Sequence, residues 1–231
     1  MSWKSFDEII NGKHHKRAIS NYYRNKSIGI KTADDKDASD TDLIAPRSDE
    51  ALRHSTVCRV KEKDLLYCQY GGNFPLMKFA YANLGQVICE IMAVYDAMKL
   101  SGYIDDDSDF DEFFKIACEF EVNAPYITPT GHFGGDYRRI GDFLRSRGVD
   151  FTVCRDIDKI DAEIRSSESC VVSYRFDHVG VHSFCCYYDG DKLVSINRGS
   201  GCLYLWYDNS VNDCLRGDKL LVGYILKHKQ A

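Results

Sequence analysis

The chain has 231 residues, of which 44% are hydrophobic, enough for one large domain or one domain with an extension. Its formal net charge of −5 disfavours a general nucleic-acid binder, although residues 1–31 carry seven basic against two acidic side chains. No apolar run approaches the roughly 20 residues of a membrane span, and the first residues lack the apolar core of a signal peptide. We therefore expect a cytoplasmic protein with no membrane partner.

Ten cysteines are present, but they lack the paired CxxC spacing of a zinc site. In a reducing compartment most of them would be free thiols. The pattern predicts neither a bound metal nor a disulfide framework.

Residues 1–55 show little apolar periodicity and are predicted to form a basic N-terminal arm followed by an acidic, flexible linker. The arm is expected to be a solvated flank packed loosely on the domain, with a partner contact as the alternative. From residue 56 onward the chain is denser in apolar side chains, so the predicted domain covers residues 56–231.

The segment from Asn83 to Gly102 predicts a helix that begins at Cys89. A thiol at a helix N-terminus lies among unpaired N–H groups, which stabilise the thiolate and raise its nucleophilicity. Apolar residues follow at steps of three and four and define the expected buried face: Ile88, Ile91, Met92, Tyr95 and Met98.

Two further helices are predicted after this one. The first covers about residues 109–120, where Asp109 and Glu112 have the spacing of a capping box. The second follows a glycine-rich turn at residues 131–135 and ends at Gly148, with Tyr137, Ile140, Phe143 and Leu144 on its buried face. The turn lacks the sequence of a phosphate-binding loop, and we expect it to form a cleft wall.

A short strand and a modest helix come next, and the last sixty residues alternate with period two, as in antiparallel strands. Helices first and strands afterwards predict an α+β domain, with its helical half packed on the sheet. Within the sheet, Asp189 and Gly190 form a hairpin signal. If they are the loop residues, His182 lies directly opposite Asn197, close enough for its imidazole N–H to donate to the amide oxygen.

A thiol nucleophile needs a histidine that takes its proton and a third group that orients the histidine. Cys89, His182 and Asn197 occur in the order found in papain-like cysteine peptidases, and residues 65–200 resemble the compact bacterial branch related to double-glycine leader peptidases. The resemblance implies a papain-like fold in which Cys89 is the nucleophile, His182 the general base and then acid, and Asn197 the orienting residue.

The same resemblance implies an oxyanion site made by the Cys89 N–H and a side-chain amide. Gln86 is the favoured donor, with Asn83, at the spacing found in papain itself, as the alternative. Gly134, Gly135 and His132 are expected to line the cleft. His178 is a competing histidine, but the hairpin register gives it no orienting partner.

The leading hypothesis is a cysteine-dependent peptidase or amidase that forms a thioester with its peptide or amide substrate and needs no cofactor. An acyltransferase that passes the acyl group to an amine is an alternative. A carrier protein as the partner would favour this transfer, whereas a precursor peptide as the partner would favour leader cleavage by the hydrolase. A third hypothesis is a binding module on the same scaffold, with partner surfaces on the basic arm and the acidic loop after Gly102.

Overall fold

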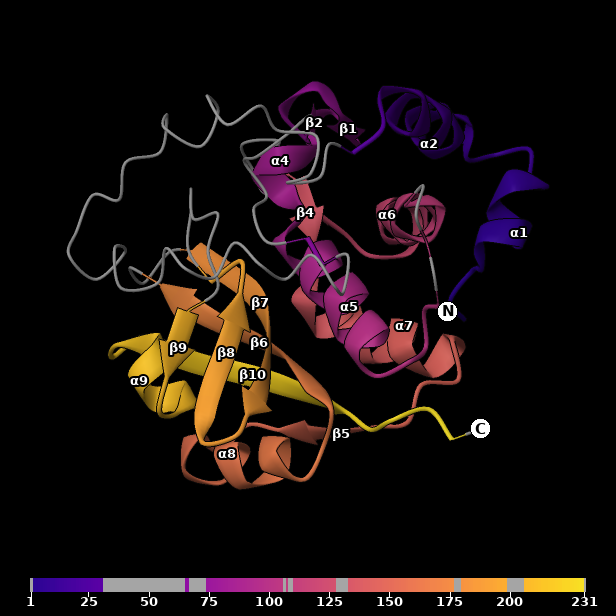
Figure 1. Ribbon diagram of the computed structural model, residues 1–231. Coiled ribbons are helices and arrows are strands. Elements are labelled where there is room, and N and C mark those ends of the chain that lie inside the picture. Colours follow the sequence, from indigo (N-terminus) through magenta and orange to yellow (C-terminus); the bar gives the residue numbers. More distant parts are fainter. Residues whose placement is uncertain are drawn as a thin grey trace, which may run out of the picture.

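The computed structural model describes residues 2–30, 65–66, 74–105, 107, 110–127, 133–176, 180–198 and 206–230. The described part is a mixed α+β protein, with a helical half on one side and an antiparallel sheet on the other (Figure 1). Within these residues, no helix is long and apolar enough to cross a bilayer.

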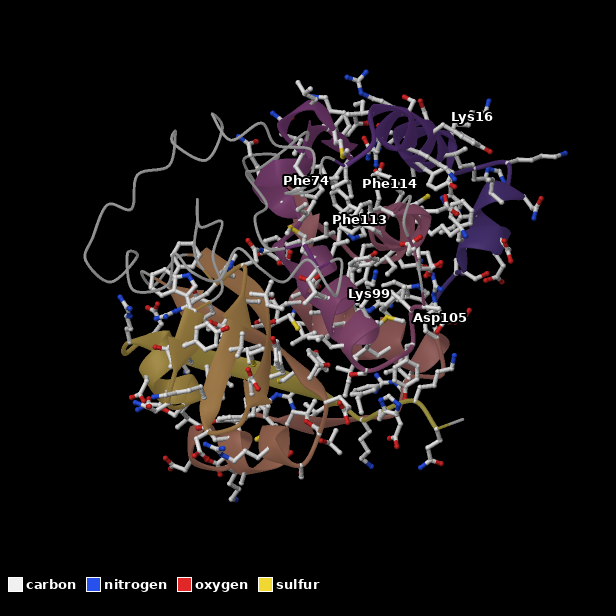
Figure 2. The ribbon with its side chains drawn as sticks, in the orientation of Figure 1. Lys16, Phe74, Lys99, Asp105, Phe113 and Phe114 are labelled. Carbon is white, nitrogen blue, oxygen red and sulfur yellow. The ribbon has the colours of Figure 1, made fainter. Side chains whose placement is uncertain are left out.

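The helical half is built around two central helices, α5 (Cys89–Leu100) and α6 (Asp111–Asn123). Around them lie shorter elements: α1 (Phe6–Ile10), α2 (Lys16–Ile28), η5 (Phe74–Leu76), β1 (Lys78–Phe79), β2 (Ala82–Asn83), α4 (Leu84–Val87), β3 (Pro125–Ile127), β4 (Phe133–Gly135), η6 (Tyr137–Arg139) and α7 (Ile140–Ser146). Aromatic rings fill the space between them, and Figure 2 shows Phe74, Phe113 and Phe114 gathered there.

The predicted basic arm lies against α6 as α1 and α2 (Figure 1). Arg17 pairs with Glu121 at 2.9 Å and Lys26 with Asp111 at 2.5 Å. Tyr22 is buried and its hydroxyl also donates to Asp111. These two arm cations are therefore engaged within the protein rather than held on a free surface. Residues 31–64, which include the predicted linker, lie outside the described residues.

Helix α5 is covered on nearly every side. All five predicted core positions are buried, and so is every other residue from Cys89 to Met98. The prediction of one buried face thus underestimates how much of the helix is buried, because α6, β4 and the sheet together enclose it. Two acids, Glu90 and Asp96, are enclosed with it.

The helix predicted at about residues 109–120 is α6, and it begins later than expected, at Asp111. Its N-cap is Phe110, which adopts a left-handed conformation, and the Glu112 N–H donates to the Asp107 carboxylate. Asp109, the predicted cap, lies outside the described residues. The helix predicted after the glycine-rich turn is confirmed in α7, where Ile140, Phe143 and Leu144 are fully buried.

The C-terminal half is a six-stranded sheet in which every neighbouring pair is antiparallel. Its order is β5 (Phe151–Cys154), β10 (Lys219–Leu226), β6 (Ser169–Phe176), β7 (Gly180–Asp189), β8 (Lys192–Ile196) and β9 (Trp206–Asp208). One face packs on α5, and the other is covered by α8 (Ile157–Arg165) and α9 (Val211–Leu215). Cys185 and Cys186 face opposite sides, so each is buried in a different core.

The predicted hairpin register is wrong by two residues. Asp189 pairs with Lys192, so the two loop residues are Gly190 and Asp191. Gly190 has a φ of 57°, and a glycine at the first loop position suits a type II′ hairpin. Strand β8 ends at Ile196, so residues 180–184 of β7 pair with β6 but not with β8.

Candidate active site

Cys89 is the first residue of α5. Ile88 precedes it as the N-cap, with a φ of −104°, and its carbonyl accepts the first helical hydrogen bond from Met92 at 2.9 Å. The short helix α4 ends one residue earlier, at Val87. The chain therefore bends just before Cys89, and the Cys89 N–H is one of the unpaired donors at the start of the helix.

The Cys89 thiol is a neutral group in this arrangement. Its Sγ donates to Oε2 of Glu90 at 3.2 Å. Burial raises the pKa of the thiol well above its usual value, and the Glu90 carboxylate raises it further. The backbone N–H groups of Ser183 and Glu90 act against this rise by donating to the sulfur. The expected effect of the helix N-terminus on the thiolate is thus outweighed by burial and by a neighbouring acid.

His182 is buried in the first half of β7, two residues after the strand begins. Its Nε2 contacts the backbone carbonyl of Asn197 at 2.5 Å. Because a carbonyl only accepts, Nε2 must carry the proton, which leaves Nδ1 of the neutral ring with a free lone pair. Burial lowers the pKa of His182, and the Asn197 carbonyl partly offsets this. Tyr174 packs edge-on against the ring at 5.8 Å.

Asn197 reaches His182 by a different route from the one predicted. In the observed register it is not opposite His182, because β8 has already ended at Ile196. The chain turns there, with Asn197 in the left-handed region at a φ of 57°. The turn directs the main-chain oxygen, rather than the side-chain amide, at the imidazole.

Cys89 and His182 are brought close through the backbone. The Ser183 N–H, which follows His182 directly, lies close enough to the Cys89 sulfur to lower the pKa of the thiol. By strand alternation the His182 ring shares a face with Phe184, which packs in the core under α8 and α9, whereas α5 packs on the opposite face of the sheet. Among the hydrogen bonds of the described residues, none joins the Cys89 sulfur to the His182 ring.

The two predicted oxyanion donors lie on the segment just before Cys89. Gln86 is on α4 and its side chain is exposed. Asn83 is the N-cap of α4 and half-buried, and its side chain makes no capping hydrogen bond. Both side chains therefore precede Cys89 on the same bent segment, and of the two only Gln86 is exposed.

The predicted cleft wall approaches Glu90 and Val87. A Cβ added to Gly135 would lie 3.1 Å from Cδ1 of Phe120 and 3.5 Å from Cβ of Glu90. One added to Gly134 would lie 3.5 Å from the Val87 carbonyl oxygen. The two glycines thus let the backbone of β4 lie directly on the start of α5. His132 and the competing His178 lie outside the described residues.

Two residues of this site were missed in the sequence. Glu90 is not among the predicted site residues, although an acid directly after a helix-initial cysteine is visible in the sequence. Ser183 acts through its N–H, so no side-chain pattern could have indicated it. Within the described ranges, no three His, Cys, Asp or Glu side chains are grouped so that they could hold a metal ion.

Comparisons with known proteins give no relative for this chain. No protein-family model matches it, and neither a curated protein nor a solved structure does. The site must therefore be interpreted from its own chemistry.

Proposed function

We propose that the protein is a cysteine-dependent hydrolase of peptide or amide bonds, with Cys89 as the nucleophile and His182 as the general base. The observation that carries this proposal is the position of Cys89 as the first residue of α5, where the Ser183 N–H lies close enough to lower the pKa of the thiol. It places a helix-initial thiol one residue from a buried histidine whose tautomer is fixed by the Asn197 carbonyl.

The resting charges favour proton transfer during attack rather than a preformed ion pair. The pKa of the thiol is raised and that of the imidazole is lowered, so both groups are neutral near pH 7. As Sγ bonds to the substrate carbonyl carbon, the thiol proton would pass to Nδ1 of His182. This transfer requires side-chain rotations of Cys89 and His182 that bring Sγ and Nδ1 within hydrogen-bond distance.

The remaining steps follow from the same groups. The Cys89 N–H and the exposed Gln86 amide, or Asn83 in its place, would donate to the oxyanion. His182 would return its proton to the leaving amine as the C–N bond breaks, giving a thioester. Water, deprotonated by His182, would then attack the thioester, releasing the carboxylic acid and restoring the thiol.

The test is covalent labelling with a panel of peptidyl acyloxymethyl ketones, read by peptide mass spectrometry. We expect the label on Cys89, with a rate at least about 100-fold lower in His182→Gln, the usual contribution of a general base. His228→Gln is the matched control, since His228 lies beside Gly102 beyond the far end of α5. Labelling of another cysteine, or equal rates in wild type and His182→Gln, would overturn the proposal.

A further inference from the structure

Glu90 is a buried acid that the proposed reaction does not use. It is the second residue of α5, is 6% exposed and accepts the Cys89 thiol proton through Oε2. A carboxylate in the first turn of a helix is favoured by the helix dipole, but enclosing one in a core is costly unless it has a polar partner. The partner here is the proposed nucleophile itself.

The position of Glu90 is fixed by the strand above it. The backbone of β4 covers the carboxylate, and a Cβ on Gly135 would lie 3.7 Å from Oε2 and one on Gly134 3.9 Å from it. Because Glu90 is 6% and Cys89 8% exposed, the contact between the acid and the thiol is largely kept away from water. A hydrogen bond in such surroundings is stronger than the same bond at a surface.

We propose that Glu90 is a positioning residue that holds the Cys89 proton in the resting protein and so keeps the nucleophile in its unreactive thiol form. It competes with His182 for that proton. Entry of a substrate carbonyl beside Cys89 then selects the arrangement in which the thiol turns from Glu90 toward the histidine. This inference concerns the regulation of the site and rests on the proposed role of Cys89.

Few charged groups of the described residues lie around Glu90. On its own helix the titratable neighbour is Cys89, and beyond it on β7 lies His182. Asp136, which directly follows β4, raises the pKa of Glu90. Asp136 itself forms an ion pair with Arg138 at 2.7 Å. Burial has the largest effect and raises the pKa of Glu90 to about 7.

The acids of the neighbouring helix α6 have other partners. Glu119 pairs with Arg147 at 2.7 Å, and Glu121 pairs with Arg17. The proton of Cys89 is therefore controlled by Glu90 on one side and by His182 on the other.

The first experiment compares iodoacetamide labelling of Cys89 in wild type and Glu90→Gln from pH 5 to 10. Glutamine keeps the shape and removes the charge, so we expect the labelling midpoint to fall by at least about one pH unit, which gives about tenfold faster labelling at pH 9, where Glu90 of the wild type is ionised. Asp96→Asn is the matched control, because it replaces another buried acid of the same helix, and it should leave the Cys89 rate unchanged. An unchanged or raised midpoint in Glu90→Gln would overturn the inference.

The wild-type profile gives a second test that does not depend on the folding of the variant. Below pH 7 the logarithm of the rate should rise with slope one. Just above pH 7, where Glu90 loses its proton, the logarithm of the labelling rate should stop rising with pH, because Glu90 and Cys89 then share a single proton. An uninterrupted slope of one through pH 7 would contradict the inference.

These outcomes are separable from those of the proposed function. Faster labelling in Glu90→Gln together with equal ketone labelling in His182→Gln would keep the inference and reject the hydrolase. The reverse pair of results would reject the inference and keep the hydrolase.

Discussion

The His182 ring donates to the main-chain oxygen of Asn197, not to its side chain. The amide of this asparagine is therefore dispensable for orienting the imidazole. What the position requires is a residue that tolerates a φ of 57° and so keeps the carbonyl in place.

The first prediction follows from this contact. Asn197→Gly should keep the ketone-labelling rate of Cys89 within about twofold of wild type, because glycine adopts positive φ readily. Asn197→Val should slow labelling by tenfold or more, since a β-branched residue is strongly disfavoured there. If both variants lose reactivity equally, the side-chain amide orients the ring after all.

The second prediction concerns the pH dependence of stability at His182. Its pKa is lowered in the folded protein by burial, whereas the unfolded chain has a pKa of about 6.5. Below pH 6.5 the unfolded state binds the proton first, so acidification should reduce the free energy of unfolding. Urea midpoints at pH 7.5, 6.0 and 5.0 should decline less in His182→Gln. Parallel declines in the two proteins would show that another group is responsible.

The third prediction has the opposite sign and concerns Asp96. Oδ1 accepts the Leu66 N–H at 2.8 Å, and Oδ2 is buried with no hydrogen-bond partner among the described residues. Burial raises the pKa of Asp96 well above its usual value, so the folded protein keeps a proton that the unfolded chain releases above about pH 4. Stability is therefore lost as pH rises, and Asp96→Asn should remove that loss.

Melting temperatures at pH 4.5 and 8 test the Asp96 prediction. The gain of Asp96→Asn over wild type should be larger at pH 8 than at pH 4.5. A gain that is the same at both values, or larger in acid, would contradict it.

The fourth prediction concerns the acid that anchors the N-terminal segment. Glu119 accepts hydrogen bonds from the Trp3 indole, the Phe6 N–H and Arg147. Glu119→Leu should lower the free energy of unfolding by about 3 kcal/mol, the low end for breaking a buried ion pair, since Arg147 is partly exposed and keeps Glu112.

Asp142→Asn is the control for Glu119→Leu, because it breaks half-exposed ion pairs with Arg139 and Arg145. It should cost less than about 1 kcal/mol. Similar losses in the two variants, measured by urea unfolding, would show that Glu119 has no special role.

The sequence predicted the α+β class and the position of Cys89 well, because periodicity reports directly on which side chains are buried. It failed at the hairpin for a specific reason. The run Asp189–Gly190–Asp191 offers two possible loops, and the two registers differ by two residues, so they put the same side chains on the same face. The hydrophobic pattern cannot distinguish such registers.

The hydrophobic pattern also could not predict the direction of the pKa shift of Cys89. The helix N-terminus at Cys89 predicts a stabilised thiolate, but burial and Glu90 reverse the direction of the pKa shift. Both effects depend on how closely β4 and β7 approach α5, and those approaches are made by backbone groups of Gly135 and Ser183.

Helix α5 is enclosed by elements of both halves, α6 and β4 from one and β6 and β7 from the other (Figure 1). Neither half has a complete core without it. Their folding should therefore be cooperative, with one unfolding transition rather than two. The same coupling means that Cys89 acquires its environment only when the whole chain has folded, so a nascent or partly unfolded chain would carry an ordinary thiol without the raised pKa.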